Sequence, residues 1–391
     1  MKRSTIITIA LFVVGMFLLT AGFILFTDNN ISNGIFTTTT TTTGGNGGGD
    51  DPKHDPMDLL NTDLSQYITL GQYKDLEIEV DMLEVSDEYI NTQIDNLLIS
   101  KGKYTKLFEG TVTEGAVFSF NYVGYLDGVP FDKGNAAGAE AYISDGVFYL
   151  TSGTSFIEGF AEGVLGAEVG EWFEITAKFP DNYGEETLKG KEVIFDIKIN
   201  YIAEANEPTD ALIKECTSNK YETVEAYKTY LKSSAESQIK QNNLNTLWQT
   251  IYDNSTIISV PQQQLDYWYY YYRGMVEYYV EYYGMFGYTV TYEQMLVEMG
   301  FENDDALKTY AKETVETELV VFAIMKAEDI TATDEEYEKL VTDLMASENK
   351  TREEIISAYG EDQMRKDIMT SKTETFVEKN NSFVLNSDSE E

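Results

Sequence analysis

The chain has 391 residues, a length that suggests two or three domains with sizeable cores. It holds 67 acidic against 28 basic residues, and the formal net charge of −39 argues against nucleic acid and anionic lipid surfaces as partners. The only histidine, His54, and the only cysteine, Cys216, exclude a multi-histidine metal site, a thiolate metal cluster and an intramolecular disulfide. No nucleotide-binding motif appears, so we expect neither a metal nor a cofactor.

An apolar run opens the chain. Lys2 and Arg3 precede Ser4–Phe26, which contains no charge. As a helix this run would span about 34 Å, more than the roughly 30 Å hydrocarbon core of a bilayer. A cleaved signal peptide is the alternative, but its apolar core is normally about 7–15 residues long. We therefore expect a cytoplasmic stub and transmembrane signal anchor in residues 1–27. The basic pair predicts a single-pass protein of the cell membrane with the remaining domains on the extracytoplasmic side.

Residues 28–62 have the composition of a tether. They include the unbroken threonine run Thr37–Thr43 and the glycine-rich Gly44–Gly49. Such a sequence cannot bury a core, and it predicts a flexible, solvated spacer.

Residues 63–112 predict a strand and a helix that lead into the next domain. Ser86 is a candidate N-cap, and Asp87 and Glu88 follow in the first turn, where the helix dipole favours acidic side chains. One face of this helix is apolar, and it carries Ile90, Ile94, Leu97 and Leu98.

Residues 113–203 alternate like half-buried antiparallel strands. Phe118, Phe120 and Tyr122 alternate with polar residues and lead into Asp127–Gly128, a hairpin signal. Similar alternation recurs at 173–177 and 193–199. Between these runs, Phe156–Val164 places its apolar residues on one helical face. A short helix pressed on a curved sheet predicts an apolar cleft with aromatic walls.

This block resembles the FKBP-type peptidyl-prolyl isomerases, in the variant found inside trigger factor. The segments that carry the likeness follow one another in the family's order: Gly115–Asp132, Phe148–Gly153, Phe156–Leu165, Val169–Thr176, Phe179–Tyr183 and Leu188–Ile199. Two departures stand out, an extra segment at Gly134–Gly146 and a turn at Gly153–Ile157 that is one residue short. The resemblance implies an α+β fold, in which an FKBP-type curved antiparallel sheet with a short helix comes before an all-α chaperone domain.

The expected chemistry is isomerisation of Xaa-Pro bonds, whose uncatalysed barrier is about 18–20 kcal/mol. The twisted amide is less polar than the planar one, so a dry aromatic pocket with a few fixed donors favours it. The resemblance implies that Asp132 lies near the substrate carbonyl, that the Ile157 amide donates to this carbonyl, and that Phe160 forms the pocket floor. The implied catalytic residues are Tyr122, Phe131, Asp132, Phe148, Phe156, Ile157, Phe160, Tyr183 and Phe195. The alternative is that these side chains only fill a barrel core.

Residues 204–385 show a helical pattern, and an acidic tail follows at 386–391. Three capping boxes begin at Thr291, Thr333 and Thr351, and Gly300 and Gly360 are stop signals. A long amphipathic helix is expected over Asp304–Asp329. The order of these elements resembles the chaperone arms of trigger factor, which are related to the SurA-like fold, and the whole resemblance covers about residues 68–385. The family's ribosome-docking domain has no counterpart ahead of it, so the ribosome is not expected as a partner.

The stretch Leu265–Tyr292 is unusually rich in tyrosine. Consecutive tyrosines point all round a helix, so some of them must face solvent or a partner. Tyrosine and methionine offer large, adaptable contact area. The alternative is that the stripe packs in a core or at a dimer seam. The candidate client-binding residues are Tyr267, Trp268, Tyr271, Tyr272, Met275, Tyr279, Tyr282 and Phe286.

Together these features predict a membrane-tethered, extracytoplasmic foldase. It would isomerise Xaa-Pro bonds in unfolded or newly exported polypeptides and hold those chains as a chaperone. Two alternatives stay open. One is a non-catalytic holdase with a vestigial isomerase domain, and the other is a surface adhesion or interaction protein that uses the tyrosine-rich helix.

Overall fold

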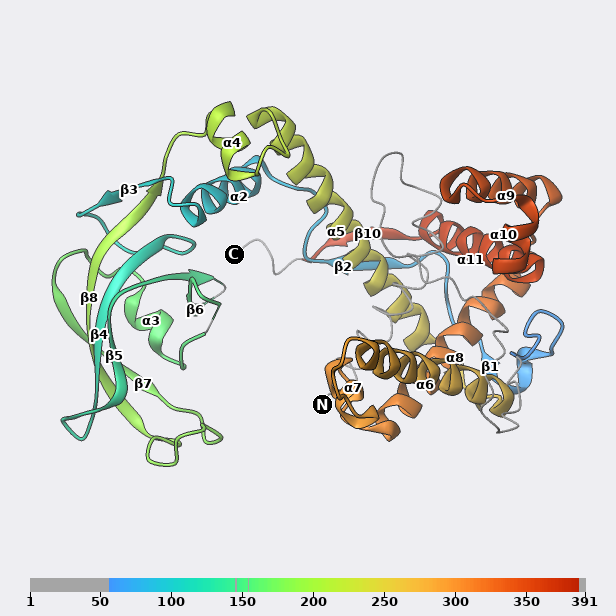
Figure 1. Cartoon of the computed structure of the whole chain (residues 1–391), viewed down its shortest axis with the longest axis horizontal. Helices are drawn as coiled ribbons and strands as arrows, with labels where there is room; N and C mark the ends of the chain where they lie inside the picture. Colours follow the sequence, from blue (N-terminus) through green and yellow to red (C-terminus); the bar gives the residue numbers. More distant parts are fainter. Residues whose placement is uncertain (1–55, 145, 154, 387–391) are drawn as a thin grey trace. The chain divides into compact units, whose positions relative to one another are not determined.

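The computed structural model describes residues 56–144, 146–153 and 155–386, without the side chains of Asp132 and Lys133. The predicted anchor, the tether up to residue 55 and the tail from residue 387 lie outside the described residues. The chain divides into two compact units (Figure 1), a sheet unit at Glu84–Gln238 and a helical unit formed by the sequence before and after it. Among the described residues, none of the helices combines the length and the apolar character that crossing a membrane requires.

The sheet unit is built on six antiparallel strands. Their order is β3-β8-β4-β5-β6, and β7 pairs with a further stretch of β8 (Figure 1). The strands are β3 (Tyr104–Leu107), β4 (Val117–Leu126), β5 (Val129–Ser144), β6 (Val147–Leu150), β7 (Trp172–Lys178) and β8 (Glu192–Ala205). Their apolar residues alternate with polar ones, as the period-two pattern predicted, and the inward set forms one continuous core.

The turn between β4 and β5 is the predicted hairpin turn. Leu126 pairs with Val129, and the two residues between them, Asp127 and Gly128, have φ of 53° and 77°. Positive φ at both central residues is the geometry of a two-residue type I′ turn, which Asp-Gly favours.

Strand β5 absorbs the extra segment that the sequence analysis set apart at Gly134–Gly146. Its second half pairs with β4 on one side and β6 on the other. The ladder is irregular near its start, because Val123 pairs with Asn135 and Tyr125 with Pro130. Residues 131–134 of β5 therefore lie opposite Gly124 alone, in a bulge of four residues against one.

The short helix of the sheet unit, α3 (Phe160–Val164), begins later than the apolar spacing predicted. Gly159 precedes it with φ of 91°, a conformation outside the right-handed helix. Phe156 and Ile157 consequently lie before the helix and not in its first turn. Phe160 and Val164 are buried against the sheet.

Three helices flank the sheet in sequence. Helix α2 (Asp87–Ser100) is capped by Ser86, whose side chain accepts from the Tyr89 amide, as predicted. Its buried face packs against α4 (Asp210–Cys216) and the first turns of α5 (Val224–Asn254).

The described part of the helical unit contains the rest of α5 and six further α-helices. These are α6 (Gln262–Met285), α7 (Tyr292–Glu298), α8 (Asp304–Ala327), α9 (Asp334–Glu348), α10 (Arg352–Tyr359) and α11 (Glu361–Lys379). The three predicted capping boxes are confirmed at α7, α9 and α10. Helix α8 is the central element, because its side chains are buried in the clusters of both α6 and α11.

The helical unit also holds strands, so it is not all-α. Strand β1 (Ile68–Thr69), which follows a 3-10 turn at Leu64–Gln66, pairs antiparallel with β9 (Thr256–Ile257). Strand β2 (Glu77–Val80) pairs in parallel with β10 (Ser382–Leu385). Leu59, Leu64 and Ile68 are buried in the core that α8 supplies. The stretch from Met57 to Val80, assigned from its sequence to tether and linker, therefore packs as part of the helical unit.

Candidate functional site

The aromatic residues proposed for the isomerase pocket meet in one cluster. Phe148 on β6, Phe160 on α3 and Phe195 on β8 are buried, and their rings pack edge to face, with centroids 4.8 Å apart for Phe148–Phe160 and 5.0 Å for Phe160–Phe195. Five further candidates are partly exposed and cover this buried centre, namely Tyr122, Phe131, Phe156, Ile157 and Tyr183.

The partly exposed rings contact one another as well as the buried rings at the centre of the cluster. Tyr122 packs edge-on against Phe156 at 5.5 Å and against Phe195 at 5.9 Å. Phe131 contacts Phe195 at 5.8 Å. The tyrosine hydroxyl is the polar group of this surface, and burial raises the pKa of Tyr122, with a smaller contribution from Tyr183. The phenol therefore stays neutral at physiological pH.

Three buried rings of the cluster, Phe118, Phe120 and Phe179, were not among the candidate pocket residues. Phe179 links Phe131, at 5.9 Å, to Tyr183, at 4.5 Å. Its signal was available, because it continues the alternation of Phe173, Ile175 and Ala177 by one more inward position.

Just before α3, the N–H groups of Ile157, Glu158 and Gly159 have no backbone acceptor among the described residues. Phe156 donates its N–H to the Phe148 carbonyl at 2.9 Å, and the Ile157 carbonyl accepts from Phe160 at 3.3 Å. The Ile157 N–H itself has no acceptor within the described part of the chain. Asp132 lies in β5, but its side chain is outside what the structure describes.

The proposed client-binding residues on α6 divide into two groups. Tyr272 is buried, and Tyr267, Trp268, Tyr271, Met275 and Tyr279 are half-buried. Trp268 stacks on Tyr272 at 5.5 Å and donates its indole N–H to Glu318 at 2.9 Å. These contacts pack the first part of α6 onto α8, as the core alternative anticipated for some of the tyrosines.

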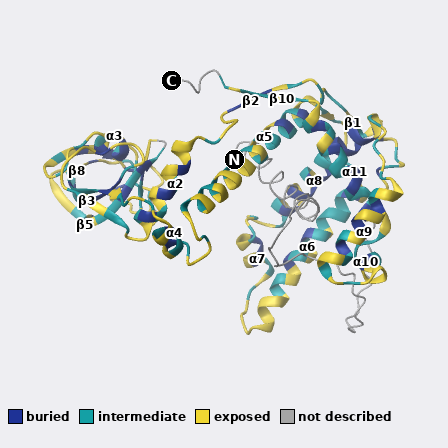
Figure 2. Cartoon of the chain, turned by 90° about the horizontal axis from the view of Figure 1, so that it is seen from above, coloured by how far each residue is buried: buried dark blue, intermediate teal, exposed yellow. Residues whose placement is uncertain are grey.

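The second group lies at the far end of α6 and in the turn after it. Tyr282 and Phe286 are exposed, and Figure 2 shows this end of the helix largely in the colour of exposed residues. Four neighbours that were not among the candidates share the exposure. We call the whole set the aromatic tip: Tyr278, Tyr282, Tyr283, Met285, Phe286 and Tyr288.

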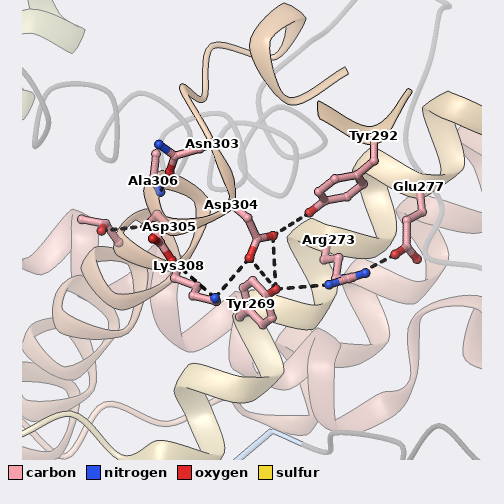
Figure 3. A network of polar contacts seen from close by, with 10 residues as sticks. Tyr269, Arg273, Glu277, Tyr292, Asn303, Asp304, Asp305, Ala306 and Lys308 are labelled. Atoms are coloured by element: carbon pink, nitrogen blue, oxygen red, sulfur yellow. Dashed lines mark hydrogen bonds and ion pairs between the residues drawn. The ribbon is translucent and has the colours of Figure 1, made fainter. Parts of the chain in front are cut away.

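A polar network fastens the base of the aromatic tip to α8 (Figure 3). The Asp304 carboxylate, in the first turn of α8, accepts hydrogen bonds from Tyr269 and Tyr292, both at 2.9 Å, and pairs with Lys308 at 3.2 Å. Burial raises the pKa of Asp304, but these donors outweigh it and hold the pKa below its ordinary value. Arg273 lies over the Tyr292 ring at 5.3 Å.

No group of three or more His, Cys, Asp or Glu side chains that could hold a metal ion occurs in the part of the chain that the structure describes. The aromatic side chains of the cluster offer a partly exposed apolar surface on which an apolar group could pack. Such packing requires no nucleophile.

Comparison with known proteins agrees with the division of the chain into a sheet unit and a helical unit. Residues 109–200 match the family "FKBP-type peptidyl-prolyl cis-trans isomerase", and residues 223–378 match "Bacterial trigger factor protein (TF) C-terminus". The trigger factor of Staphylococcus carnosus (strain TM300) is 28% identical over 310 residues, which are 77% of this chain and 67% of that protein. The trigger factor of Halothermothrix orenii is 31% identical over 304 residues, which cover 75% and 66%.

This chain is also similar to a solved structure, "Promiscuous Substrate Recognition in Folding and Assembly Activities of the Trigger Factor Chaperone". The match covers 79% of this chain and 72% of the solved chain, at 17% sequence identity. Its TM-score of 0.30 is too low to support an argument about the fold.

The sheet unit and the helical unit thus define a chaperone that contains an isomerase domain of the FKBP type. More particularly, the chain is a trigger factor-like protein. The expectation about a ribosome-docking domain stays a prediction, because the family matches begin at residue 109.

The predicted location in the cell membrane is wrong by these findings. The finding that overturns it is that the relatives are trigger factors. The prediction depended on Ser4–Phe26 alone, which lies outside the described residues. Its physical basis was the length of an uncharged run, and apolar runs also occur in segments that are not membrane spans, such as cleaved signal peptides.

Proposed function

We propose that this trigger factor-like protein is an active foldase, which isomerises Xaa-Pro bonds in unfolded polypeptides that its helical unit holds. The observation that carries the catalytic part is the aromatic cluster, in which Tyr122, Phe156 and Phe195 surround Phe160 next to the unpaired Ile157 amide. A proline ring packed on these rings would leave its carbonyl within reach of a fixed donor. An apolar surrounding favours the twisted amide over the planar one.

The catalytic proposal is tested by NMR exchange spectroscopy on a short Xaa-Pro peptide with the full chain. The protein should accelerate cis/trans exchange, and Tyr122→Ala should reduce that acceleration at least tenfold. The matched control is Tyr142→Ala. This tyrosine of the same sheet stacks on Tyr149 at 5.4 Å and does not enter the cluster. Thermal melts would establish that all three proteins are folded. No acceleration by the folded parent would leave a chaperone that only binds.

The client-holding part rests on the aromatic tip. Tyr282, Met285 and Phe286 are 39%, 74% and 64% exposed, although side chains of this kind are usually buried. Large, partly polar rings and a flexible thioether suit many weak contacts with unfolded chains. Because the first part of α6 packs as core, the tip is where we expect clients to bind.

This part is tested by the suppression of aggregation of a denatured protein. The triple change Tyr282→Ser, Met285→Ser, Phe286→Ser should weaken suppression several-fold without lowering the melting temperature. The control replaces equally exposed apolar residues of the sheet unit, with Phe108→Ser, Trp172→Ser and Ile194→Ser. Equal losses in both triple variants would show that surface apolarity in general, and not the tip, binds the client. Binding restricted to one protein sequence would favour the adhesion alternative.

A further inference from the structure

Phe131 occupies a slot between two glycines. A Cβ atom added to Gly124 would lie 2.4 Å from Cζ and 2.6 Å from Cε1 of the Phe131 ring. A Cβ atom added to Gly134 would lie 2.4 Å from Cε2 and 2.6 Å from Cδ2 of the same ring. Ordinary van der Waals contact begins at 3.4 Å, so either alanine would push the ring by about 1 Å, 3.4 minus 2.4.

The bulge between β4 and β5 creates this slot. Residues 131–134 lie opposite Gly124 alone, so the chain leaves the ladder and returns to it within four residues. Both Phe131 and Gly134 belong to this excursion, and the ring of the first lies against the backbone of the second and of Gly124. The ring thereby covers Gly124, which is buried and faces Phe195 of β8 across the ladder.

Two other aromatic rings contact Phe131, and the ring keeps a partly exposed side. Phe179 and Phe195 meet it edge to face, with centroids 5.9 Å and 5.8 Å away. Since backbone borders the ring at both glycines and two packed rings border it as well, movement of Phe131 towards any of these groups is restricted. A phenylalanine side chain without such borders would choose among several rotamers.

We propose that Gly124 and Gly134 are positioning residues for prolyl isomerisation, because together they set the depth at which Phe131 forms one wall of the proline site. This inference rests on the proposed isomerase function. Neither glycine touches the substrate, and each acts through the ring. A displacement of about 1 Å in a group that orients a substrate can reduce turnover by about 100-fold.

The test uses Gly134→Ala in the full chain, because the nearest atoms around its added Cβ all belong to Phe131. NMR exchange on an Xaa-Pro peptide should show kcat/KM reduced about 10- to 100-fold. The matched control is Gly184→Ala in the same unit. Its Cβ would meet nothing within 4 Å and its backbone is not in the left-handed region, so exchange should be unchanged.

A double-mutant cycle separates the slot from a general effect on folding. In a Phe131→Leu background the smaller side chain leaves room, so adding Gly134→Ala should change exchange by less than about twofold, since coupled residues are non-additive. An equal loss in both backgrounds would overturn the proposal. Should Gly134→Ala alone fail to fold, rescue of folding by Phe131→Leu supports the slot, and no rescue overturns it.

Melting temperatures of the parent, Gly134→Ala, Phe131→Leu and the double variant distinguish failure of the slot proposal from failure of the proposed isomerase function. Additive effects on melting and on exchange mean that the slot is absent, whatever the parent's activity. A parent that accelerates nothing removes the catalytic role of both glycines. Coupled melting temperatures in that case would show a steric slot in a domain without isomerase activity.

Discussion

The hydroxyl of Tyr269 donates a hydrogen bond to the carboxylate of Asp304 at 2.9 Å, and this bond joins α6 to the first turn of α8. Tyr292, which begins α7, donates to the same carboxylate. One acidic side chain therefore connects three helices at the base of the aromatic tip (Figure 3).

Asp304→Asn should destabilise the helical unit by about 1–2 kcal/mol at pH 7, because hydrogen bonds to a charged acceptor become neutral ones. The pKa of Asp304 is lower in the folded protein than its unfolded value of about 3.9. Its contribution is therefore present above about pH 4 and is lost as the pH falls through the folded-state pKa.

Urea unfolding of parent and variant between pH 7 and pH 3 measures this directly. The difference in the free energy of unfolding should shrink towards pH 3. Glu302→Gln is the control, since this exposed carboxylate has no ion pair or hydrogen bond among the described residues. A difference that stays constant with pH would assign the effect of Asp304→Asn to packing.

Tyr272→Phe should cost about 1 kcal/mol. The Thr314 hydroxyl donates to the Tyr310 carbonyl at 3.0 Å, so in the 3.0 Å contact between Thr314 and Tyr272 the tyrosine is the donor. Removing it leaves a buried threonine oxygen without that partner. Tyr278→Phe, on the exposed side of the same helix, should change the melting temperature by less than one degree, in keeping with small surface effects. Equal shifts for the two variants would refute the assignment of Tyr272 to the core.

Local signals in the sequence predicted the local structure well. Asp127–Gly128 requires no distant partner to form its turn, and Thr333 and Glu336 satisfy each other's backbone within one helical turn. The apolar spacing of Phe156–Val164 misplaced the start of α3, because the left-handed conformation of Gly159 leaves no mark on periodicity. The aromatic residues proposed for the pocket lie together in one cluster, and their catalytic roles stay a prediction. The steric slot around Phe131 depends on a bulge that no spacing rule predicts.

Long-range pairing was out of reach of pattern reasoning. Glu77–Val80 alternates over only four residues, and its partner strand begins after all the helices. The tyrosines of α6 posed a different difficulty. A helix that is aromatic all round has no distinct apolar face, so sequence cannot separate Tyr272, in the core, from Tyr278, on the surface.

Thr333→Ala should cost about 1 kcal/mol, because it removes the acceptor that caps α9 at the Glu336 amide. Thr342→Ala within the same helix should be neutral or slightly stabilising, since alanine has the higher helix propensity. Chemical denaturation of the two variants side by side checks this pair. A larger loss for Thr342→Ala would contradict the importance of the cap.

Asn381→Ala should cost about 2 kcal/mol. Its side chain accepts from the Leu76 amide at 2.8 Å and donates to the carbonyls of Tyr73, at 3.0 Å, and Val377, at 2.7 Å. Among the described residues, the side chain of the neighbouring Asn380 donates to the Phe376 carbonyl of the preceding helix alone, so Asn380→Ala should cost much less. Hydrogen exchange at the amides of β2 and β10 should quicken in the first variant alone. Unchanged protection in both would mean that the strand pair does not depend on Asn381.

The parallel pairing of β2 with β10 also imposes an order on biosynthesis. Strand β2 leaves the translation machinery about 300 residues before its partner, a wait of roughly 15–60 s at bacterial elongation rates of about 5–20 residues per second. The residues of the sheet unit are made in about the first half of that interval, whereas the helical unit lacks its closing strand until the end of it. The helical unit therefore stays incomplete for most of the time that the chain is being made.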